Sequence, residues 1–504
     1  MTLSSKTIYG DFQTPREFCE SVVTLIDEKY HFVPKIVLEP TIGEGNFLLP
    51  FRNKNILLLG IDINEEYVNQ TNLLFNACNK NIVKASAFDF DFYKAFKLED
   101  DLPLLCIGNP PWITNSQLSS ADSSNLPIKT NAIKDNNGFS AISGSSNFDV
   151  AEYILIHLFS NLKNRDNTLF AFLVKSIVAR NIFRDAKKHG FNFNIFDVYN
   201  FDAREVFDVS CDACLLVCSL NQTKQKVKYA SEYDLSDPYK IVKKYGFVNE
   251  VFVSNVDKYI KGQSISGVSQ IEWRQGIKHD CSKVMELTIK NDKLFNKLDE
   301  DCTFLLKCNR LFPLVKSSEI KGGRISSFKH YVIVTQDRPG HDTEFLKHDP
   351  MLWDYLVKHE EYFNNRKSII YKKAKRFAIF GVGDYSFTKY KIALSGFYKK
   401  PCFTFLDGSK PVMTDDTCYF IGTNNKLFAE CLYCILDQDN VYDFLLSVAF
   451  SDSKRPFTKD VLQTIDLVKV FKQANINDLI IRLQREFSDT AEERTIIELF
   501  DSLN

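Results

Sequence analysis

The chain has 504 residues, of which 44% are hydrophobic and 25% charged, a composition ordinary for a soluble globular protein. Apolar runs of 18 residues and a charged-then-apolar leader are both absent, so the sequence predicts neither a membrane span nor secretion. Its 13 cysteines are scattered without a framework, which favours a reducing cytoplasm. A chain of this length is expected to hold roughly two to four domains.

A helix is predicted near the N-terminus. The pair Thr14-Pro15 precedes an apolar pattern that includes Phe18, Val22 and Ile26. Threonine is a favoured N-cap and proline a favoured first helical residue, so we expect the helix to begin at Pro15 with Thr14 capping it.

A glycine-containing turn follows the first predicted strand. The strand 36–39 leads into the turn 41–45, which contains Gly43 and Gly45, and an apolar segment predicted to be helical comes next. Glycines allow a ligand to approach the backbone closely. The spacing fits neither a dinucleotide fingerprint nor a phosphate loop, and Glu39 at the strand end disfavours a pyrophosphate. A ligand that carries an ammonium group suits this turn better.

The second predicted strand, 56–63, ends at another acid. Asp62 lies 19 residues after Gly43, close to where such folds hold an acid against ribose hydroxyls. A surface acid in a turn explains Asp62 by itself equally well. A third apolar pattern spans 85–92.

The run 104–107 predicts a buried parallel strand, and Asn109-Pro110-Pro111-Trp112 follows it closely. Proline cannot donate to a sheet ladder, so the two prolines stop the strand and set a rigid turn. Asn109 is therefore expected at the carboxyl end of a strand, where open α/β sheets bind their ligands. A strand followed by an ordinary tight loop is the alternative.

Serine and asparagine dominate residues 114–147, which predicts either a long loop beside the site or a disordered insertion. The α/β alternation then resumes and breaks into polar sequence near 221–240, where we expect a domain boundary. The predicted elements after the loop are a helix from 149, a strand at 169–174, a helix at 175–188, and strands at 196–201 and 214–220.

A basic segment, 366–400, carries ten lysines and arginines against one acid, with aromatic residues between them. Basic side chains neutralise phosphates and aromatics pack against bases, so this segment is a candidate nucleic-acid surface. A solvated β-surface with its aromatics in a core is the alternative. The candidate DNA-binding residues are Lys372, Lys373, Lys375, Arg376, Lys389 and Lys391.

Together these motifs resemble the gamma-type N6-adenine DNA methyltransferases of restriction–modification systems. The resemblance covers about residues 10–220 and, more loosely, the C-terminal half as a target-recognition region. It implies an α/β fold, with a Rossmann-like doubly wound methyltransferase sheet in 1–225 and an α+β target-recognition region with a helical C-terminus in 226–504. The motifs in chain order are Gln13-Thr14-Pro15, Leu38-Glu39-Pro40 with Gly43 and Gly45, Asp62, Asn109-Pro110-Pro111-Trp112 and Glu205-Val206-Phe207.

The resemblance implies S-adenosyl-L-methionine as the cofactor. Thr14 would close the pocket over the methionine end, with Glu39 near the ammonium group. Asp62 would bind the ribose hydroxyls and Ile63 would pack on the adenine. The family usually has an Asp-Phe pair in its third motif, which Asp89-Phe90 offers in only one register. The cofactor-binding residues implied are Thr14, Glu39, Thr41, Gly43, Gly45, Asp62, Ile63 and Asp89.

The implied reaction explains the residue types of the catalytic motif. An exocyclic adenine amine is a poor nucleophile, so the Asn109 side-chain oxygen and the Pro110 carbonyl would accept its two N–H groups and aim its lone pair at the methyl group. The base must first be flipped from the duplex, and Trp112 and Phe207 would stack on it. The catalytic residues implied are Asn109, Pro110, Pro111, Trp112 and Phe207.

Other functions stay open at this point: an RNA or protein-glutamine methyltransferase, or a catalytically idle DNA-binding subunit. Zinc is disfavoured, because Cys211, Cys214, Cys218, Cys431 and Cys434 lie in apolar patterns without a paired histidine. We therefore expect no metal, and a cytoplasmic, nucleoid-associated monomer that acts on double-stranded DNA. A separately encoded restriction endonuclease is a candidate partner.

Overall fold

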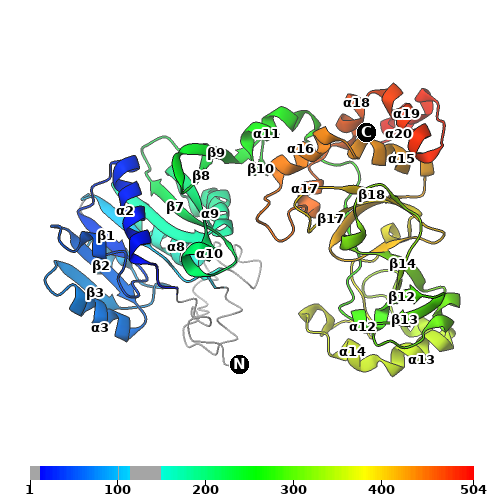
Figure 1. Ribbon diagram of the computed structural model, residues 1–504, viewed down its shortest axis with the longest axis horizontal. Helices are drawn as coiled ribbons and strands as arrows, with labels where there is room; N and C mark the ends of the chain where they lie inside the picture. The colour runs from blue at the N-terminus through cyan, green and yellow to red at the C-terminus, as the bar shows by residue number, and fades with distance from the viewer. Residues whose placement is uncertain (1–11, 100, 114–148, 504) are drawn as a thin grey trace. The chain divides into compact units, whose positions relative to one another are not determined.

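The computed structural model describes residues 12–99, 101–113 and 149–503 (Figure 1). It divides into two compact units, Met1–Asp257 and Lys258–Asn504. The boundary lies later than the expected 225/226 because three further strands, β8 to β10, extend the sheet of the first unit. The predicted Ser/Asn-rich loop, 114–147, lies outside the described residues. Within those residues, no helix combines the length and the apolar character needed to cross a membrane.

The first unit is built on a ten-stranded sheet in the order β10-β9-β8-β6-β7-β5-β4-β1-β2-β3. Strands β3, β2, β1, β4 and β5 are parallel, and β7 inserts antiparallel between β5 and β6. The strands are β1 (Ile36–Glu39), β2 (Leu57–Asp62), β3 (Lys80–Lys84), β4 (Leu104–Gly108), β5 (Thr168–Lys175), β6 (Phe193–Asp202), β7 (Asp212–Leu220), β8 (Tyr229–Asp234), β9 (Asp237–Val248) and β10 (Val251–Val253).

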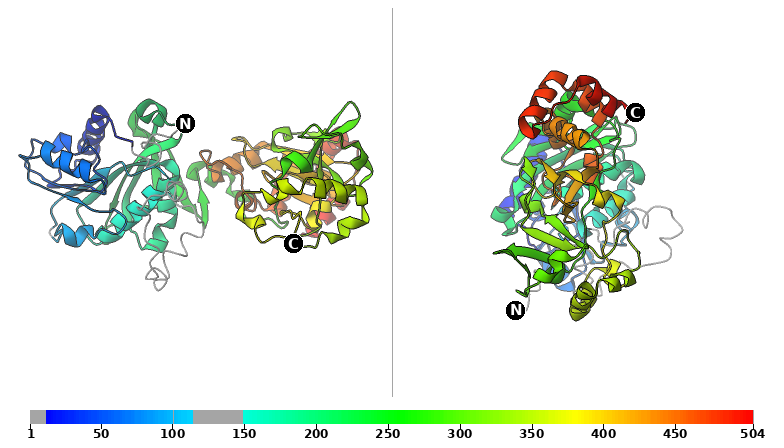
Figure 2. Two further views of the ribbon diagram at one scale, coloured as in Figure 1. Left: turned by 90° about the horizontal axis from the view of Figure 1, so that it is seen from below. Right: turned by 90° about the vertical axis from the view of Figure 1, so that its right-hand side faces the viewer.

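Helices cover both faces of this sheet (Figure 1; Figure 2). Side chains alternate between the faces of a strand. In β5, Ala171 packs in the same core as Val22 of α2, whereas Phe170 contacts Phe159 of α8 with ring centroids 4.7 Å apart. The helices are α2 (Arg16–Tyr30), α3 (Glu65–Leu74), α4 (Phe92–Ala95), α8 (Val150–Leu162), α9 (Ser176–His189) and α10 (Ala203–Phe207), with the 3-10 turn η1 (Leu49–Phe51).

Three local predictions differ from the structure. Pro15, not Thr14, is the N-cap of α2, and no side chain caps that helix. The segment after the glycine turn forms turns and η1 instead of an α-helix. The third strand is Lys80–Lys84, and the apolar residues that follow it form a loop and the short helix α4. These differences leave the strand order unchanged.

The second unit contains two five-stranded sheets, β11-β20-β17-β18-β15 and β13-β12-β16-β14-β19, and a group of C-terminal helices. The strands are β11 (Arg274–Gln275), β12 (Glu286–Lys290), β13 (Lys293–Asn296), β14 (Leu311–Val315), β15 (Arg324–Ile325), β16 (His330–Ile333), β17 (Tyr390–Ser395), β18 (Phe403–Asp407), β19 (Met413–Thr414) and β20 (Cys418–Thr423). The largest core of this unit packs under the second sheet and includes Met285, Val332 and Phe377.

Helix α11 (Val256–Gly262) spans the division between the units. The predicted C-terminal helices are confirmed. The helices after α11 are α12 (Ser282–Met285), α13 (Pro350–Lys358), α14 (Glu360–Asn364), α15 (Lys426–Leu436), α16 (Asp439–Val448), α17 (Lys459–Leu462), α18 (Leu467–Gln473), α19 (Ile476–Phe487) and α20 (Glu493–Asp501). The 3-10 turns are η2 (Gln263–Ile265), η3 (Thr303–Lys307), η4 (Ser317–Glu319), η5 (Glu344–His348), η6 (Ile369–Tyr371) and η7 (Asp384–Phe387).

Candidate active site

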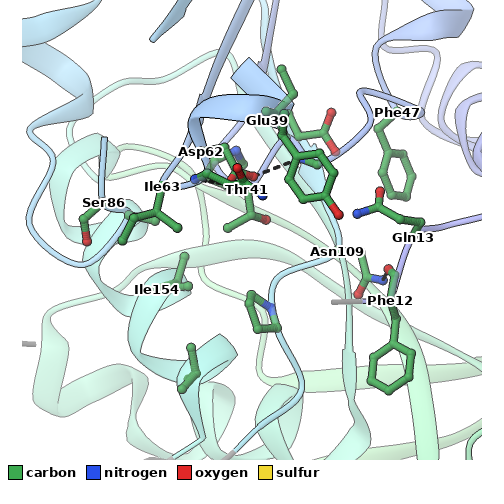
Figure 3. Close-up of a pocket in the computed structure, with 18 of the residues that line it drawn as sticks. Phe12, Gln13, Glu39, Thr41, Phe47, Asp62, Ile63, Ser86, Asn109 and Ile154 are labelled. Carbon is green, nitrogen blue, oxygen red and sulfur yellow. Dashed lines mark hydrogen bonds between the residues drawn. The ribbon is translucent and has the colours of Figure 1, made fainter. Parts of the chain in front are cut away.

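A cavity of about 420 Å³ opens at the carboxyl ends of β1, β2 and β4 (Figure 3). Glu39 ends β1, Asp62 ends β2, and Asn109 follows β4, so three residues predicted from separate motifs line one cavity. Parallel strands bring their carboxyl ends to the same edge of a sheet, which is where such sheets bind ligands. The other predicted residues that line it are Thr14, Thr41, Gly43, Ile63 and Pro111.

The glycine turn is fixed by close packing and by Asp62. Gly43 has φ +48°, and a Cβ added there would lie 2.7 Å from the Gln13 Oε1 atom. Gly45 has φ +76°, so an L side chain would be strained at both positions. The Gly43 N–H donates to Asp62 Oδ2 at 3.0 Å and the Asn64 N–H donates to Oδ1 at 2.8 Å. Asp62 therefore holds the turn and keeps lone pairs that can accept ribose hydroxyls.

Among the residues that the structure describes, four polar atoms of this cavity are buried without a hydrogen-bond partner. They are Glu39 Oε2, Thr41 Oγ1, Asn46 Oδ1 and Asn109 Oδ1. A buried polar group without a partner costs about 1–3 kcal/mol, so such a concentration indicates a ligand that brings donors. Burial, and then the nearby charge of Asp62, raise the pKa of Glu39 well above its ordinary value. A cationic donor would relieve that cost.

The side chain of Asn109 has one possible orientation. Its Nδ2 donates to the Phe12 carbonyl at 3.0 Å and to Thr14 Oγ1 at 3.2 Å. Both amide hydrogens are thus used, and Oδ1 has no hydrogen-bond partner within the described part of the chain. Thr14 is 4% exposed, and it orients Asn109 instead of capping α2. The site therefore presents an acceptor and needs a substrate with an N–H or O–H donor.

The aromatic residues are arranged differently from the prediction. Trp112 is 6% exposed, donates from Nε1 to the Leu173 carbonyl at 3.1 Å, and is not among the residues that line the cavity. Its ring packs edge-on against Phe207 at 5.2 Å and lies 6.4 Å from Phe12. The predicted base slot between Trp112 and Phe207 is therefore closed in this structure. Pro110 is buried, and Pro111 lines the cavity in its place.

The apolar end of the cavity corrects the assignment of Asp89. Figure 3 shows Ile63, Ser86 and Ile154 together on one side of the cavity, away from Asn109. Asp89 is exposed and does not line the cavity. Because β3 ends at Lys84, residues 85–88 line the cavity, and the Asp89-Phe90 pair comes directly after the last of them. Ser86, and not Asp89, lines this end of the cavity.

Sequence reasoning missed Phe12, Asn46 and Tyr67, which also line the cavity. Asn46 Nδ2 donates to the Thr14 carbonyl at 3.0 Å, so the residue joins the glycine turn to the segment before α2. The position of Asn46 directly after Gly45 in the sequence could have indicated that it lines the cavity. Phe12 and Tyr67 had no such signal, because they reach the cavity only through the packing of α2 and α3.

The basic segment of the second unit does not act as one surface. Lys391 is 1% exposed and donates to the Thr388 carbonyl at 2.9 Å, and burial lowers its pKa to about 7. Lys389 donates to the Gly408 carbonyl. Arg376 forms two hydrogen bonds of 2.6 Å with the Glu360 carboxylate. Lys391 is therefore buried away from any DNA surface, whereas Lys389 and Arg376 are engaged in contacts within the unit.

Lys372, Lys373 and Lys375 retain the predicted exposure. Within the described part of the chain, none of them forms an ion pair. They lie in the segment between α14 and β17 and remain available to an anionic partner.

This fold and this cavity define the class of S-adenosylmethionine-dependent methyltransferases with a Rossmann-like sheet. S-adenosylmethionine is the cofactor of the chain. The residues present fit it, because Glu39 offers a buried acidic acceptor for the ammonium group, Asp62 lies at the second strand end, and Ile63 and Ile154 supply an apolar end.

Comparison with known proteins gives the family. The chain is 36% identical over 477 residues to the Type II methyltransferase M.NspV of Nostoc sp., which covers 92% of this chain and 97% of that protein. The chain therefore belongs to the Type II methyltransferases. The structure of the Type IIL restriction–modification enzyme MmeI was solved in complex with DNA. The match covers 97% of this chain and 71% of the MmeI chain, with a TM-score of 0.52 at 13% sequence identity, so the two proteins share the fold. No protein-family model matches the chain.

Proposed function

We propose that this chain is a site-specific DNA adenine-N6 methyltransferase that protects host DNA in a restriction–modification or related defence system. The observation that carries the proposal is the oriented Asn109 amide, whose Oδ1 is buried and unpaired beside the cofactor cavity. An acceptor at this place suits an exocyclic amine, which brings two N–H donors. The order of the motifs around it is that of adenine-specific enzymes.

The chain's own residues supply orientation and electrostatics. When bound, S-adenosylmethionine provides an electrophilic methyl group on a sulfonium centre. Asn109 Oδ1 accepts one N–H of the adenine amine, which draws the nitrogen towards tetrahedral geometry and turns its lone pair away from the ring. Because Phe12 and Thr14 hold the amide, no reorganisation is needed when the amine arrives. S-adenosylmethionine would supply its methyl group to this nitrogen and lose its sulfonium charge, one amine proton would pass to solvent, and Asn109 Oδ1 would keep its hydrogen bond to the remaining N–H.

A base reaches this site only if it is flipped from the duplex, at a cost of a few kcal/mol. The aromatic cluster of Phe12, Trp112 and Phe207 is the apolar surface that can offset this cost. Since the cluster is closed, Phe207 is the side chain that moves: it sits half-buried on the short helix α10, whereas the Trp112 indole is hydrogen-bonded in the core.

DNA as the substrate is supported by the relatives. M.NspV is a Type II methyltransferase, and the enzyme MmeI that shares the fold across 97% of this chain was solved with DNA. The second unit, with exposed lysines in its basic segment, is the proposed target-recognition region. A separately encoded restriction endonuclease would complete the system.

The test is transfer of labelled methyl groups to plasmid DNA, followed by digestion to nucleosides and mass spectrometry. N6-methyladenine is the expected product. N4-methylcytosine or 5-methylcytosine would contradict the adenine assignment while keeping the enzyme class. Parallel reactions with RNA and with protein separate the alternatives, and the absence of transfer to any acceptor would indicate the catalytically idle subunit.

A further inference from the structure

Two neighbouring isoleucines of the second unit point away from its core. Ile369 is 75% exposed, a fraction that no other large hydrophobic side chain of the described residues exceeds, and Ile370 is 39% exposed. Both belong to η6, which follows α14 (Figure 1). Single exposed apolar residues are common on protein surfaces and need no explanation. A pair at one turn, flanked by charges of one sign, is less easily explained by chance.

Both ends of this turn are firmly attached to the unit. Before the isoleucines, the Arg366 guanidinium donates to the Ala378 carbonyl at 2.6 Å and to the His279 carbonyl at 3.2 Å. After them, the Tyr371 hydroxyl donates to the Lys278 carbonyl at 3.1 Å, and Arg366 lies 3.8 Å from its ring. The turn is therefore presented in a fixed conformation, so little entropy is lost when a partner binds it.

The charges that neighbour the isoleucines in the sequence are all positive, and the acids near the adjacent Tyr371, Asp280 and Asp416, come from other parts of the unit. Residues 366–376 contain no acid. In this part of the described chain, the exposed lysines that form no ion pair are Lys367, Lys372, Lys373 and Lys375. Arg366 donates to backbone carbonyl groups, and Arg376, although exposed, is paired with the Glu360 carboxylate. The free positive charge of the segment is thus concentrated on both sides of an apolar tip.

We propose that segment 366–376 is a wedge for duplex DNA, in which Ile369 and Ile370 enter between base pairs while the flanking lysines bind the phosphates. This inference rests on the DNA-binding function proposed above and adds a contact that deforms the duplex. A base stack is apolar and lies between two anionic backbones, which matches an apolar tip between lysines. Apolar side chains inserted in this way partly unstack and kink DNA.

A fixed kink assists the reaction proposed for the first unit. Unstacking lowers the free energy needed to extrude a base from the deformed duplex, and the deformation cost depends on the sequence that is bent. Two isoleucines are a small apolar area for a membrane, where stable attachment needs a whole helix face or a lipid chain. Duplex DNA therefore accounts for the tip better than a lipid surface does.

The double variant Ile369→Ser/Ile370→Ser tests the wedge in the full chain. A closed circular plasmid is relaxed by a topoisomerase in the presence of each protein, and the change in linking number is measured. We expect the change to fall at least about twofold and the affinity for the plasmid to fall about tenfold, with the salt dependence of binding unchanged. Ile481→Ser/Ile497→Ser, on exposed faces of α19 and α20, is the matched control and should behave like the wild type.

The lysines give an independent measurement. Lys372→Ala/Lys373→Ala should lower the slope of log affinity against log salt by about two and leave the linking number at saturation unchanged. An isoleucine variant that matches the wild type in linking number and affinity would overturn the wedge. So would binding to phosphatidylserine vesicles that the isoleucine variant loses while its plasmid binding persists, since this result would assign the tip to a lipid surface.

The two proposals can fail separately. If the wild type transfers no methyl group to DNA but its effect on linking number depends on the isoleucines, the proposed DNA methylation fails and the wedge stands. If methyl transfer proceeds and the isoleucine variant alters neither quantity, the wedge alone is wrong.

Discussion

The cofactor cavity and the basic segment use charge in opposite ways. In the cavity, Glu39 is 3% exposed and one of its oxygens has no partner among the described residues, so this oxygen can interact with a ligand. In the basic segment the buried cations, such as Lys391, are satisfied within the unit, and only exposed lysines remain for a partner. In the cavity, a polar group that is buried without a partner therefore indicates a functional residue. In the basic segment, a functional residue is instead indicated by a charged side chain that is exposed and forms no ion pair.

The largest effect is expected at the oriented amide. Asn109→Ala removes the Oδ1 atom that is proposed to accept a hydrogen bond from the substrate amine. This change should lower kcat for methyl transfer about 1,000-fold. The affinity for S-adenosylmethionine should change little, as measured by isothermal titration calorimetry. Asn76→Ala, an exposed asparagine, is the control. Near-normal turnover in Asn109→Ala would remove the basis of the proposed mechanism.

Replacement of the buried acid should separate binding from stability. Glu39→Gln leaves the cofactor ammonium without its charged partner and should weaken cofactor binding about 100-fold. The same variant should stabilise the empty protein at neutral pH. The folded pKa of Glu39 is raised, so its contribution to stability is present below the unfolded pKa and is lost as the pH rises through the folded pKa. Thermal melts of both proteins from pH 5 to pH 8 would check this, and parallel curves would contradict it.

The same shift predicts a pH dependence of cofactor binding. Because the pKa of Glu39 is raised in the empty site, an ammonium group that binds the ionised form must displace a proton. Affinity should therefore increase with pH up to the pKa of the empty site, and binding should release protons. Calorimetry in buffers of different ionisation enthalpy measures the release, and Glu39→Gln should abolish it.

The basic segment should divide between stability and DNA binding. Lys391→Met should leave DNA affinity unchanged and raise the stability at pH 7 by an amount on the order of a few kcal/mol. The pKa of Lys391 is lowered to about 7, so the unfolded chain binds more protons between pH 7 and the ordinary lysine pKa. The stability contributed by this residue therefore rises with pH in that range, whereas the variant should show no such rise. A loss of DNA affinity in Lys391→Met would return this lysine to the DNA surface.

The smallest effect is expected at the apolar end of the cavity. Ser86→Ala should weaken cofactor binding a few-fold, about the value of one neutral hydrogen bond, and Asp89→Ala should have no effect. A larger loss for Asp89→Ala than for Ser86→Ala would restore the assignment made from the sequence.

The residues at strand ends were predictable from the sequence because short motifs place them. Glu39, Asp62 and Asn109 each follow a recognisable apolar strand, and parallel pairing necessarily brings such ends to one edge. The sequence does not fix in this way which residue of a loop faces a cavity. For this reason Asp89 was predicted at the position where the structure has Ser86. The closed contact between Trp112 and Phe207 also escaped prediction, since it depends on packing between α10 and the loop after β4.

The second unit was predictable only in outline. Composition marked the basic segment and its aromatics, but it could not say which cations are buried or paired within the unit. Lys391 lies on β17 between β18 and β20, where every side chain but the first is buried, and Arg376 is paired with a glutamate from α14. Burial of a charge depends on partners far along the chain, and no local pattern specifies it.

The hydrogen bonds of Asn109 also concern how this protein can be engineered. The catalytic amide is held by Phe12 and Thr14, which precede it by 97 and 95 residues. A fusion or deletion that displaces the segment before α2 would thus free the amide to rotate, even though the cofactor acids on β1 and β2 stay in place. Such a protein would load its cofactor and turn over slowly, so an affinity tag is better placed at the other end of the chain.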